Sequence, residues 1–532
     1  MDALYPSAQR WLRSALVLAA LAAGEGGLLA NDVTRRVSLD STGSEVKGDS
    51  SSPSISADGR VVAFLSDAAD LVGGDTNHSP DVFVRDLVTG LTTRASVDSN
   101  GNQGDSYCAD PVISSDGHVV VFASLATNLV AGDTNNEWDV FVRDLDQGTT
   151  ERVSVAADLT EANGNSYVPV VSQDGRYVAF LSYATNLVPG DANDVADIFV
   201  KDRLTGAITL VSKSSTGDLA NGSSRLAAIS ADGRYVAFAS DATNLVPGDS
   251  NGASDIFLHD TRFAITIRVS VGAGGVQGNG DSFAPSISAD ARYVAFASQA
   301  NDLVANDTNG LTDVFVADLW TSAMQLVSIS SSGAQGDGSS DAGAISADAR
   351  YVAFRSRADN LAPGDGNGFL RDVFVRDRLL ASTEMASVTD QGAGGNDESP
   401  EAAVSGDGRL VVFATQASNL VPGDRNGASD IYLHGLELTL EEQPPVVREG
   451  DLISFTSYFG APQNAATLWA VQVDQVPFWM MIFAGVFQAD ERFVLAGALP
   501  PGLGSADIVF RVYAAGPTAF LLASNDVTVS FR

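Results

Sequence analysis

The sequence contains one cysteine, Cys108, among 532 residues, so no disulfide can form within the chain. Histidine is nearly as scarce, and three of the four histidines stand where other copies of an internal repeat carry arginine or lysine. These three are His118, His259 and His434, whereas His78 lies in a loop. We therefore expect neither a histidine-based triad nor a zinc site, and we expect Cys108 to be a small buried residue rather than a nucleophile.

Basic residues are few for a chain of this size: 31 lysines and arginines against 66 acidic residues give a net charge of −35. Such a charge repels phosphate, so we expect neither nucleic acid nor an anionic lipid surface as a partner. Beyond residue 30, no apolar segment approaches the roughly 20 residues that a helix needs to cross a bilayer, and we expect no membrane span. Protein and carbohydrate remain as partner classes.

The first thirty residues differ from the rest of the chain. Arg10 and Arg13 precede an apolar stretch at 15–23, and small residues follow it. This order is typical of a secretory signal peptide, and the apolar stretch is too short to span a bilayer. We expect residues 1–30 to be removed and the mature protein to be secreted or periplasmic. The alternative is an uncleaved membrane anchor.

Aspartate dominates the acidic residues: 13 of the 66 are glutamate, which leaves 53 aspartates. Aspartate is a turn former, because its short carboxylate accepts hydrogen bonds from nearby backbone amides. Carboxylate oxygens are also the ligands that hard divalent cations prefer. The composition therefore fits a protein of strands and turns, and it also fits a protein with many cation sites.

Seven copies of one phrase run through the chain. Each reads S-x-D-G/A-x-x-V-x-F and is followed, after a loop, by D-[IV]-[FY]-[VL]. The turn aspartates are Asp58, Asp116, Asp174, Asp232, Asp290, Asp348 and Asp407. They recur every 58 residues, with one interval of 59. A period of this length with about four strand-like runs per copy predicts an all-β fold, a seven-bladed β-propeller with one blade per copy.

The ends of the repeat region predict how the ring closes. The last copy stops at Gly435 after its third strand, whereas Arg36-Val37-Ser38 near the start reads as a fourth strand without a copy of its own. We therefore expect residues 32–40 to pair with 430–434 and to complete the seventh blade, which removes an open edge. The propeller domain is predicted to span 31–435.

The repeat resembles the WD-like repeats of TolB-type propellers. The matching text is "SISADGRYVAFAS", followed by "DIFVKD", with variants in all seven copies over about three quarters of the chain. The resemblance implies the propeller fold. Relatives of this kind serve in envelope transport, peptidase gating, lyase activity and plain binding, so the resemblance leaves the function open.

Residues 436–532 no longer follow the repeat. Six or seven strand-like runs occur there, and we expect a small β-sandwich of immunoglobulin-like type. Five aromatic residues in this region, Trp469, Phe478, Trp479, Phe483 and Phe487, are explained either as sandwich core or as a carbohydrate-stacking platform.

The loop between the second and third strands carries the strongest candidate site. Every copy has D-x-N followed by an aspartate at the start of the third strand, which gives oxygen ligands at positions 1, 3 and 7 as in loops that bind Ca²⁺. The sets are Asp75, Asn77 and Asp81; Asp133, Asn135 and Asp139; Asp191, Asn193 and Asp197; Asp249, Asn251 and Asp255; Asp307, Asn309 and Asp313; Asp365, Asn367 and Asp372; and Asp424, Asn426 and Asp430. The alternative is structural, because Asp and Asn also form side-chain-to-backbone turns.

These loops and the connections between copies should share one face of the propeller, which is then polar and acidic. We expect a non-catalytic, exported binding or scaffolding protein that takes a protein or carbohydrate ligand on this face and is stabilised by calcium. The rivals are a polysaccharide lyase or glycosidase acting in the central cleft, and a structural surface or adhesin component. An enzyme should break the symmetry of the repeat at a few central loops, and these loops are nearly uniform in sequence.

Overall fold

The computed structural model describes residues 33–436 and, beyond them, only the backbone of nine strands between Leu440 and Phe531. The chain divides into two compact units, one of which is residues 32–436. The predicted signal segment, residues 1–30, lies outside the described residues. Within these limits no helix has the length and apolar character to cross a membrane.

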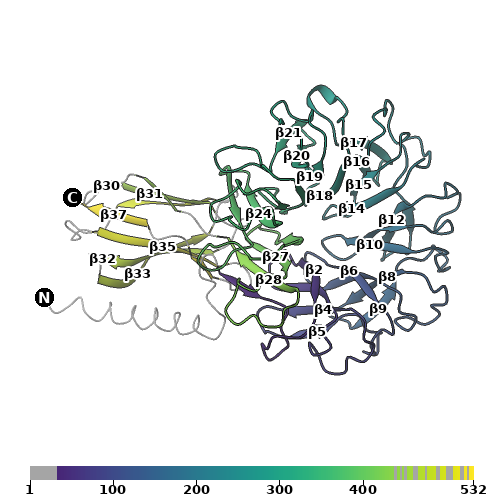
Figure 1. Cartoon of the computed structure of the whole chain (residues 1–532), viewed down its shortest axis with the longest axis horizontal. Helices are drawn as coiled ribbons and strands as arrows, with labels where there is room; N and C mark the ends of the chain where they lie inside the picture. The colour runs from purple at the N-terminus through teal and green to yellow at the C-terminus, as the bar shows by residue number, and fades with distance from the viewer. Residues whose placement is uncertain are drawn as a thin grey trace. The chain divides into compact units, whose positions relative to one another are not determined.

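Residues 34–435 form seven four-stranded antiparallel sheets, which are the seven predicted blades (Figure 1). We letter the strands of each blade a to d from the axis outward. The a strands are β2 (Ser50–Ile55), β6 (Cys108–Ile113), β10 (Ser166–Val171), β14 (Ser224–Ile229), β18 (Ser282–Ile287), β22 (Ser340–Ile345) and β26 (Glu401–Val404). The b strands are β3 (Val61–Ser66), β7 (Val119–Ser124), β11 (Tyr177–Ser182), β15 (Tyr235–Ser240), β19 (Tyr293–Ser298), β23 (Tyr351–Ser356) and β27 (Leu410–Thr415).

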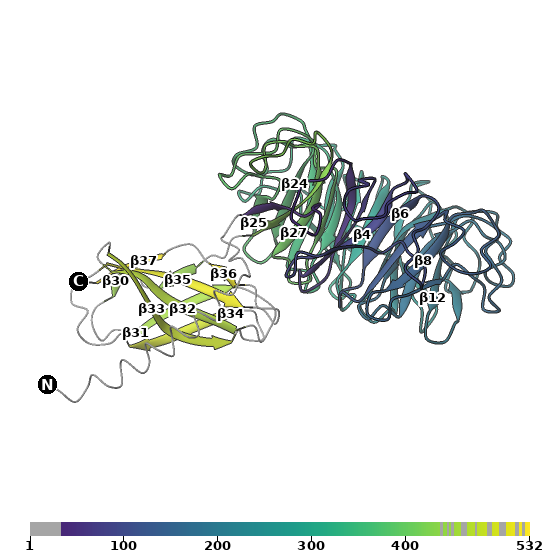
Figure 2. The same ribbon diagram turned by 90° about the horizontal axis from the view of Figure 1, so that it is seen from below.

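The outer half of each blade is built in the same way. The c strands are β4 (Asp81–Asp86), β8 (Asp139–Asp144), β12 (Asp197–Asp202), β16 (Asp255–Asp260), β20 (Asp313–Asp318), β24 (Asp372–Asp377) and β28 (Asp430–Gly435). The d strands are β5 (Thr92–Arg94), β9 (Thr149–Arg152), β13 (Ile208–Leu210), β17 (Ile265–Arg268), β21 (Ala323–Leu326), β25 (Ser382–Met385) and, for blade 7, β1 (Thr34–Arg36). Seen from the side, neighbouring blades lie face to face (Figure 2).

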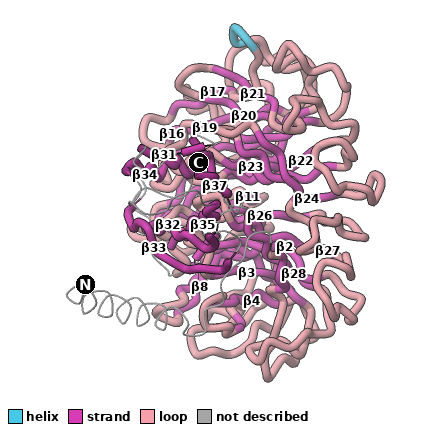
Figure 3. The backbone as a smooth tube through the Cα atoms, turned by 90° about the vertical axis from the view of Figure 1, so that its left-hand side faces the viewer, coloured by secondary structure: helices cyan, strands magenta, loops and turns pink. Residues whose placement is uncertain are grey.

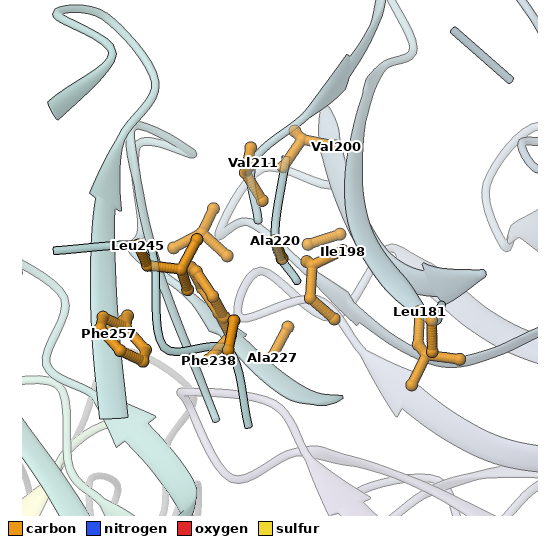
Figure 4. Close-up of a cluster of buried hydrophobic side chains, with 13 residues drawn as sticks. Leu181, Ile198, Val200, Val211, Ala220, Ala227, Phe238, Leu245 and Phe257 are labelled. Atoms are coloured by element: carbon orange, nitrogen blue, oxygen red, sulfur yellow. The ribbon is translucent and has the colours of Figure 1, made fainter. Parts of the chain in front are cut away.

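The b and c strands are apolar on both faces because each blade is covered by its two neighbours. In every blade an aromatic ring of strand b packs against one of strand c, as Phe238 does against Phe257 with centroids 6.0 Å apart. The hydrophobic clusters lie between blades rather than within them. Between blades 3 and 4, Leu181 and Ile198 meet Phe238 and Leu245 (Figure 4).

The S-x-D-G/A phrase forms the tight turn between strands a and b. In blade 1, Asp58 Oδ1 accepts hydrogen bonds from Ser56 Oγ (2.6 Å) and from the Arg60 amide (3.0 Å). The following Gly59 has φ +71°, a left-handed conformation that glycine adopts without strain. The turn aspartates therefore have a structural role.

The ring closes as predicted. Strand β1 pairs antiparallel with β28, and Thr34, Arg35 and Arg36 lie opposite His434, Leu433 and Tyr432. A belt of backbone hydrogen bonds also runs around the axis: the Ala57 amide donates to Ser115 (2.9 Å), and the Gly406 amide donates back to Ala57 (3.0 Å). The members between them are Asp116, Gln173, Ala231, Ala289 and Ala347.

Strands dominate the described residues, and the one helical segment among them is the short 3-10 turn η1 (Ala273–Gly275), coloured cyan in Figure 3. The C-terminal strands are β29 (Leu440–Gln443), β30 (Val446–Val447), β31 (Leu452–Tyr458), β32 (Ala465–Val473), β33 (Val476–Val486), β34 (Arg492–Ala498), β35 (Asp507–Ala515), β36 (Leu521–Ala523) and β37 (Val527–Phe531). They form one sheet in the order β29-β31-β34 and another in the order β30-β37-β35-β32-β33, with β36 on β35. Side chains here, including the five aromatic residues, lie outside the described part, so the sandwich stays a prediction.

Candidate functional sites on the loop face

The b–c loops and the d–a connections lie at one end of the blades, which we call the loop face. The a–b and c–d turns lie at the other end, the turn face. Each predicted Asp-x-Asn pair sits in a b–c loop, and each strand-entry aspartate is the first residue of a c strand. In six blades the loop asparagine donates a hydrogen bond to the strand-entry aspartate. In blade 5, Asn309 donates to the carbonyl of Gly336 and Gln335 donates to Asp307.

The strand-entry aspartate is held in the same way in all seven blades. One carboxylate oxygen accepts a hydrogen bond from a serine just after strand d, at 2.6 Å for Asp81 and Ser96. The other pairs are Asp139 with Ser154, Asp197 with Ser212, Asp255 with Ser270, Asp313 with Ser328, Asp372 with Ser387, and Asp430 with Ser38. This contact is structural, as the turn interpretation anticipated. The second oxygen of each aspartate faces the b–c loop.

The loop asparagine joins this aspartate to the next connection. In blade 2, Asn135 Nδ2 donates to Asp139 Oδ2 (2.9 Å) and to the carbonyl of Ala162 (3.2 Å). In five blades the asparagine Oδ1 accepts the amide two residues on, as Asn77 does from Ser79 (3.0 Å). The asparagines of blades 3 and 6, Asn193 and Asn367, have a buried Oδ1 without a hydrogen-bond partner.

Four blades place an arginine of strand d between the two aspartates. In blade 1, Arg94 lies 3.1 Å from Asp75 and 3.2 Å from Asp81. The corresponding groups are Arg152 with Asp133 and Asp139, Arg268 with Asp249 and Asp255, and Arg36 with Asp424 and Asp430. In these blades the guanidinium supplies the positive charge that a pair of buried carboxylates requires.

A residue of the d–a connection adds a further contact in some blades. Gln103 Nε2 donates to Asp75 Oδ1 and to Asp81 Oδ2, both at 2.8 Å, and Gln277 does the same in blade 4. Glu161 and Glu45 take this place in blades 2 and 7 and bind the arginine instead. Among the described residues, Glu45, Asp424 and Asp430 are three carboxylates that lie close enough together to hold a metal ion. Arg36 already forms ion pairs with Glu45 and Asp424 at this place.

Blades 3, 5 and 6 lack the arginine. Leu210, Leu326 and Met385 occupy its position at the end of strand d. In blade 3 the d–a position is also apolar, Leu219, and in blade 6 it is Gly394, whereas blade 5 keeps Gln335. The carboxylate pairs of these three blades thus have no arginine partner among the described residues.

Buried carboxylate and amide oxygens without a partner occur in these same three blades. Each blade has two of them: Asp191 Oδ1 and Asn193 Oδ1, Asp307 Oδ2 and Asp313 Oδ2, Asp365 Oδ1 and Asn367 Oδ1. None of the predicted ligands in the four arginine blades has such an atom. Burial first, and then the neighbouring carboxylate, raises the pKa of Asp191 and of Asp313 to about 6 and that of Asp365 to about 7.

The sequence did not single out the arginine and glutamine positions, although the signal was present. The d-strand phrases end in R-[VA]-S in four copies and in L-V-S or M-A-S in three. The difference becomes meaningful only once the strands show that this residue reaches the b–c loop of its own blade.

The remaining reactive side chains are structural. Cys108 is buried, and desolvation raises the pKa of its thiol to about 12. His259 and His434 are also buried and accept or donate a hydrogen bond to Thr266 and Thr34. The segment 248–252, Gly-Asp-Ser-Asn-Gly, matches the G-x-S-x-G motif of a hydrolase nucleophile elbow. It leads into strand β16 and not into a helix, as that elbow would.

An axial cavity of about 180 Å³ lies where the a strands end. Branched aliphatic residues of the a strands line it together with small residues of the backbone belt: Ile55, Val171, Ile229, Ile287, Ile345 and Val404, with Ala57, Ser115, Gln173, Ala231, Ala289, Ala347, Ser405 and Gly406. No side chain in this lining is titratable, so the lining itself offers no general acid or base.

The repeat is least uniform at three positions of the loop face. These are the second residue of strand a, the residue after strand b, and the residue before strand c. In blade 3 the first two are Tyr167 and Tyr183, and the ring of Tyr167 packs on Trp138 of blade 2 with centroids 5.7 Å apart. Tyr183 is 56% exposed, so the cluster opens to solvent.

Other blades carry charged groups at or next to these positions. In blade 4, Arg225 pairs with Asp241 (2.6 Å) and contacts Ser254 (3.4 Å). In blade 6, Asp341 pairs with Arg355 (2.8 Å) and lies 3.6 Å from Arg371. The framework of the loop face repeats, but these side chains differ from blade to blade, so the face is less uniform than the loop sequences predicted.

The a strands are strained next to this cluster. Each of β2, β6, β10, β14, β18 and β22 has a bulge, and Val168 has φ +47°, a conformation that a β-branched residue rarely adopts. Its amide donates to Asp110 Oδ2 of the preceding blade (3.2 Å). Ser52, Asp110, Leu226 and Ala284 have the same positive φ in their blades, so the bulge belongs to the repeat and not to one site.

No protein-family model matches this chain, and no curated protein matches it. Among solved structures it is similar to TolB from Agrobacterium tumefaciens, with 14% identity over 65% of this chain and 94% of that one and a TM-score of 0.35. It is also similar to the WD40 repeats of RRP9, with 9% identity, 76% and 98% coverage and a TM-score of 0.39. These similarities concern the fold alone.

Proposed function

We propose that this protein is an exported, non-catalytic propeller that binds or scaffolds a ligand on its loop face. The observation that carries the proposal is the variation among the seven copies. Positions that build the blades repeat from copy to copy, whereas the three loop-face positions near the axis carry aromatic, charged or small side chains. This arrangement suits a single asymmetric ligand that lies across several blades.

The aromatic cluster favours a carbohydrate. Tyr167, Trp138 and Tyr183 offer flat apolar faces with polar edges, which suits the C–H faces and hydroxyl groups of a sugar ring. The net charge of −35 favours a neutral or basic chain and disfavours an acidic polysaccharide. The lyase alternative is weakened for the same reason, because the acidic polysaccharides that lyases cleave would be repelled.

A binding screen tests the proposal. The purified chain should bind one or more neutral or basic polysaccharides on an array, and calorimetry with a soluble oligosaccharide should give its affinity. Tyr167→Ala combined with Tyr183→Ala should reduce that affinity at least tenfold. Trp320→Ala is the matched control, because Trp320 is 74% exposed but follows strand β20 on the turn face.

Two results would reject the proposal. Turnover of a bound polysaccharide, seen as new reducing ends or as absorbance of an unsaturated product, would make the protein an enzyme. Binding that survives the tyrosine double variant but not Trp320→Ala would place the ligand on the other face. Export is tested separately: N-terminal sequencing of the native protein should find a chain that begins after residue 23 or 30, and a product that begins at Met1 rejects it.

A further inference from the structure

The two aspartates of each b–c site need a positive charge. The strand-entry aspartate is buried and the first aspartate is buried or half-buried beside it, and two such carboxylates without a counter-charge are unfavourable. In four blades the guanidinium of Arg36, Arg94, Arg152 or Arg268 supplies it. In blades 3, 5 and 6 an apolar side chain stands in that position, yet the aspartates and the asparagine are retained.

We propose that blades 3, 5 and 6 each bind one divalent cation, Ca²⁺, at the position that an arginine fills in the other four blades. The sites are Asp191, Asn193 and Asp197; Asp307, Asn309 and Asp313; and Asp365, Asn367 and Asp372. The proposal is independent of the carbohydrate ligand, because it rests on different residues of the same face.

The unpartnered oxygens are the evidence that separates this proposal from an acidic cluster alone. Asp191, Asp307 and Asp313 are 8%, 7% and 0% exposed, and each has a buried carboxylate oxygen without a hydrogen-bond partner. In blades 3 and 6 an asparagine oxygen is left unpartnered beside the first aspartate as well. Buried polar atoms are almost always satisfied, so their recurrence in three equivalent places points to a missing partner.

The ligand type follows from the donors. All are carboxylate or amide oxygens, without imidazole or thiolate, which suits hard cations rather than zinc or copper. A divalent ion neutralises both carboxylates of a pair, whereas water neutralises neither. The apolar Leu210 and Met385, 4% and 5% exposed, prevent a protein cation from reaching these pairs along strand d.

Burial and a second carboxylate raise the pKa of Asp191, Asp313 and Asp365, because both disfavour the charged form. Burial and neighbouring carboxylates also raise the pKa of Asp133 to about 6 in blade 2, where Arg152 lies beside it, so the unpartnered oxygens and not the pKa values distinguish the three blades. Two ways of relieving that repulsion exist, a bound proton or a bound cation. A measurement of bound calcium distinguishes them directly.

The test is calcium stoichiometry on the full chain. After removal of metal with a chelator, equilibrium dialysis at pH 7.5 against Ca²⁺ in excess Mg²⁺ should find three ions per chain. Leu210→Arg, which copies the arginine of blade 4, should reduce this number to two. Arg268→Leu, which copies the arrangement of blade 5, should raise it to four.

A second variant shows whether the loss of one ion in Leu210→Arg comes from misfolding. Asp191→Asn keeps the shape of the side chain but removes one carboxylate of blade 3, and it should also reduce the number to two. Arg60→Leu is the control, since Arg60 pairs with Asp86 at the turn face (2.7 Å), far from any b–c loop, and it should leave three. A stoichiometry of zero means that these pairs bind no ion, and seven means that arginine does not replace the ion. Either result overturns the proposal, as does a value of three that Leu210→Arg and Asp191→Asn leave unchanged.

Discussion

Ser38 donates a hydrogen bond of 2.5 Å to Asp430 across 392 positions of the chain. In the other six blades the matching serine and aspartate are 15 positions apart. One contact is thus local in six blades and closes the ring in the seventh. Thr34 adds a hydrogen bond to the carbonyl of Val388 (2.5 Å), which ties the closing strand to blade 6 as well.

The closing strand should be essential for stability. Deletion of residues 31–41 removes the β1–β28 pairing and exposes the edge of β28, so several buried hydrogen bonds worth about 1 kcal/mol each are lost. We expect a large decrease in the free energy of unfolding, measured with urea, and faster proteolysis. A chain that lacks only residues 1–30 is the control and should match the parent. If both deletions unfold at the same urea concentration, the strand does not close the ring.

The aromatic pairs between strands b and c should dominate the core. Phe257→Ala leaves a cavity against Phe238 in a site that is fully buried, and we expect a loss of about 3–5 kcal/mol. Phe263→Ala is the matched control: the same residue type, six positions on, is 61% exposed and contacts Arg234. It should cost less than about 1 kcal/mol. Comparable losses for the two variants, measured by urea unfolding, would contradict this picture of the core.

Much of the fold was readable from sequence because the repeat is regular. The 58-residue period set the number of blades, and the unmatched segment around Arg36 predicted the closing strand. The bulge at Val168 could not be predicted, because the same left-handed φ recurs at Ser52, Asp110, Leu226 and Ala284, which share no residue type. A β-branched residue such as Val168 rarely has a positive φ, so its presence in the sequence gives no sign of this conformation.

The candidate site was readable only in part. The recurrence of Asp and Asn located the b–c loops, but spacing alone did not separate a cation site from a structural turn. The structure shows the structural role for Asp197, because one of its oxygens accepts a hydrogen bond from Ser212 (2.5 Å) and the other accepts one from Asn193 (2.8 Å). A cation in these loops stays a proposal. The partner that distinguishes the blades, such as Arg268 or Leu210, is on another strand.

Acid should destabilise the protein through its two buried histidines. Desolvation, with Lys213 as a lesser cause, lowers the pKa of His259 to about 4, and burial does the same for His434. The ordinary pKa of histidine is about 6.5, so between pH 6.5 and 4 the unfolded chain binds protons that the folded chain does not. The contribution of each histidine to stability should therefore decrease by roughly 3 kcal/mol as the pH falls through this window. The raised pKa values of Asp191, Asp313 and Asp365 act in the opposite direction over the same range, so the histidine contribution is measured as a difference between the parent and histidine variants.

The contribution of each histidine can be isolated. His259→Gln retains a hydrogen-bonding group next to Thr266 but cannot titrate. Its free energy of unfolding should decrease less than that of the parent between pH 7 and pH 4.5. The double variant with His434→Gln should decrease less again, because the two residues belong to blades 4 and 7. Parallel pH profiles for the parent and both variants would show that these histidines do not carry the acid sensitivity.

Calcium and arginine should be interchangeable as stabilisers of the b–c sites. Arg268→Leu leaves Asp249 and Asp255 without their cation, so in the presence of a chelator it should cost about 3–5 kcal/mol. Calcium at about 100 times its dissociation constant should recover about 2.7 kcal/mol for that one new site.

Leu210→Arg should do the reverse: it should stabilise the chelated protein and reduce the stabilisation that calcium gives. Arg60→Leu is the control and breaks the ion pair with Asp86, in which the Arg60 side chain is 44% exposed. It should lower the free energy of unfolding by less than about 1 kcal/mol and leave the response to calcium unchanged. Thermal unfolding with and without calcium measures all three variants. If Arg268→Leu is equally unstable in calcium and in chelator, an ion does not take the place of the guanidinium.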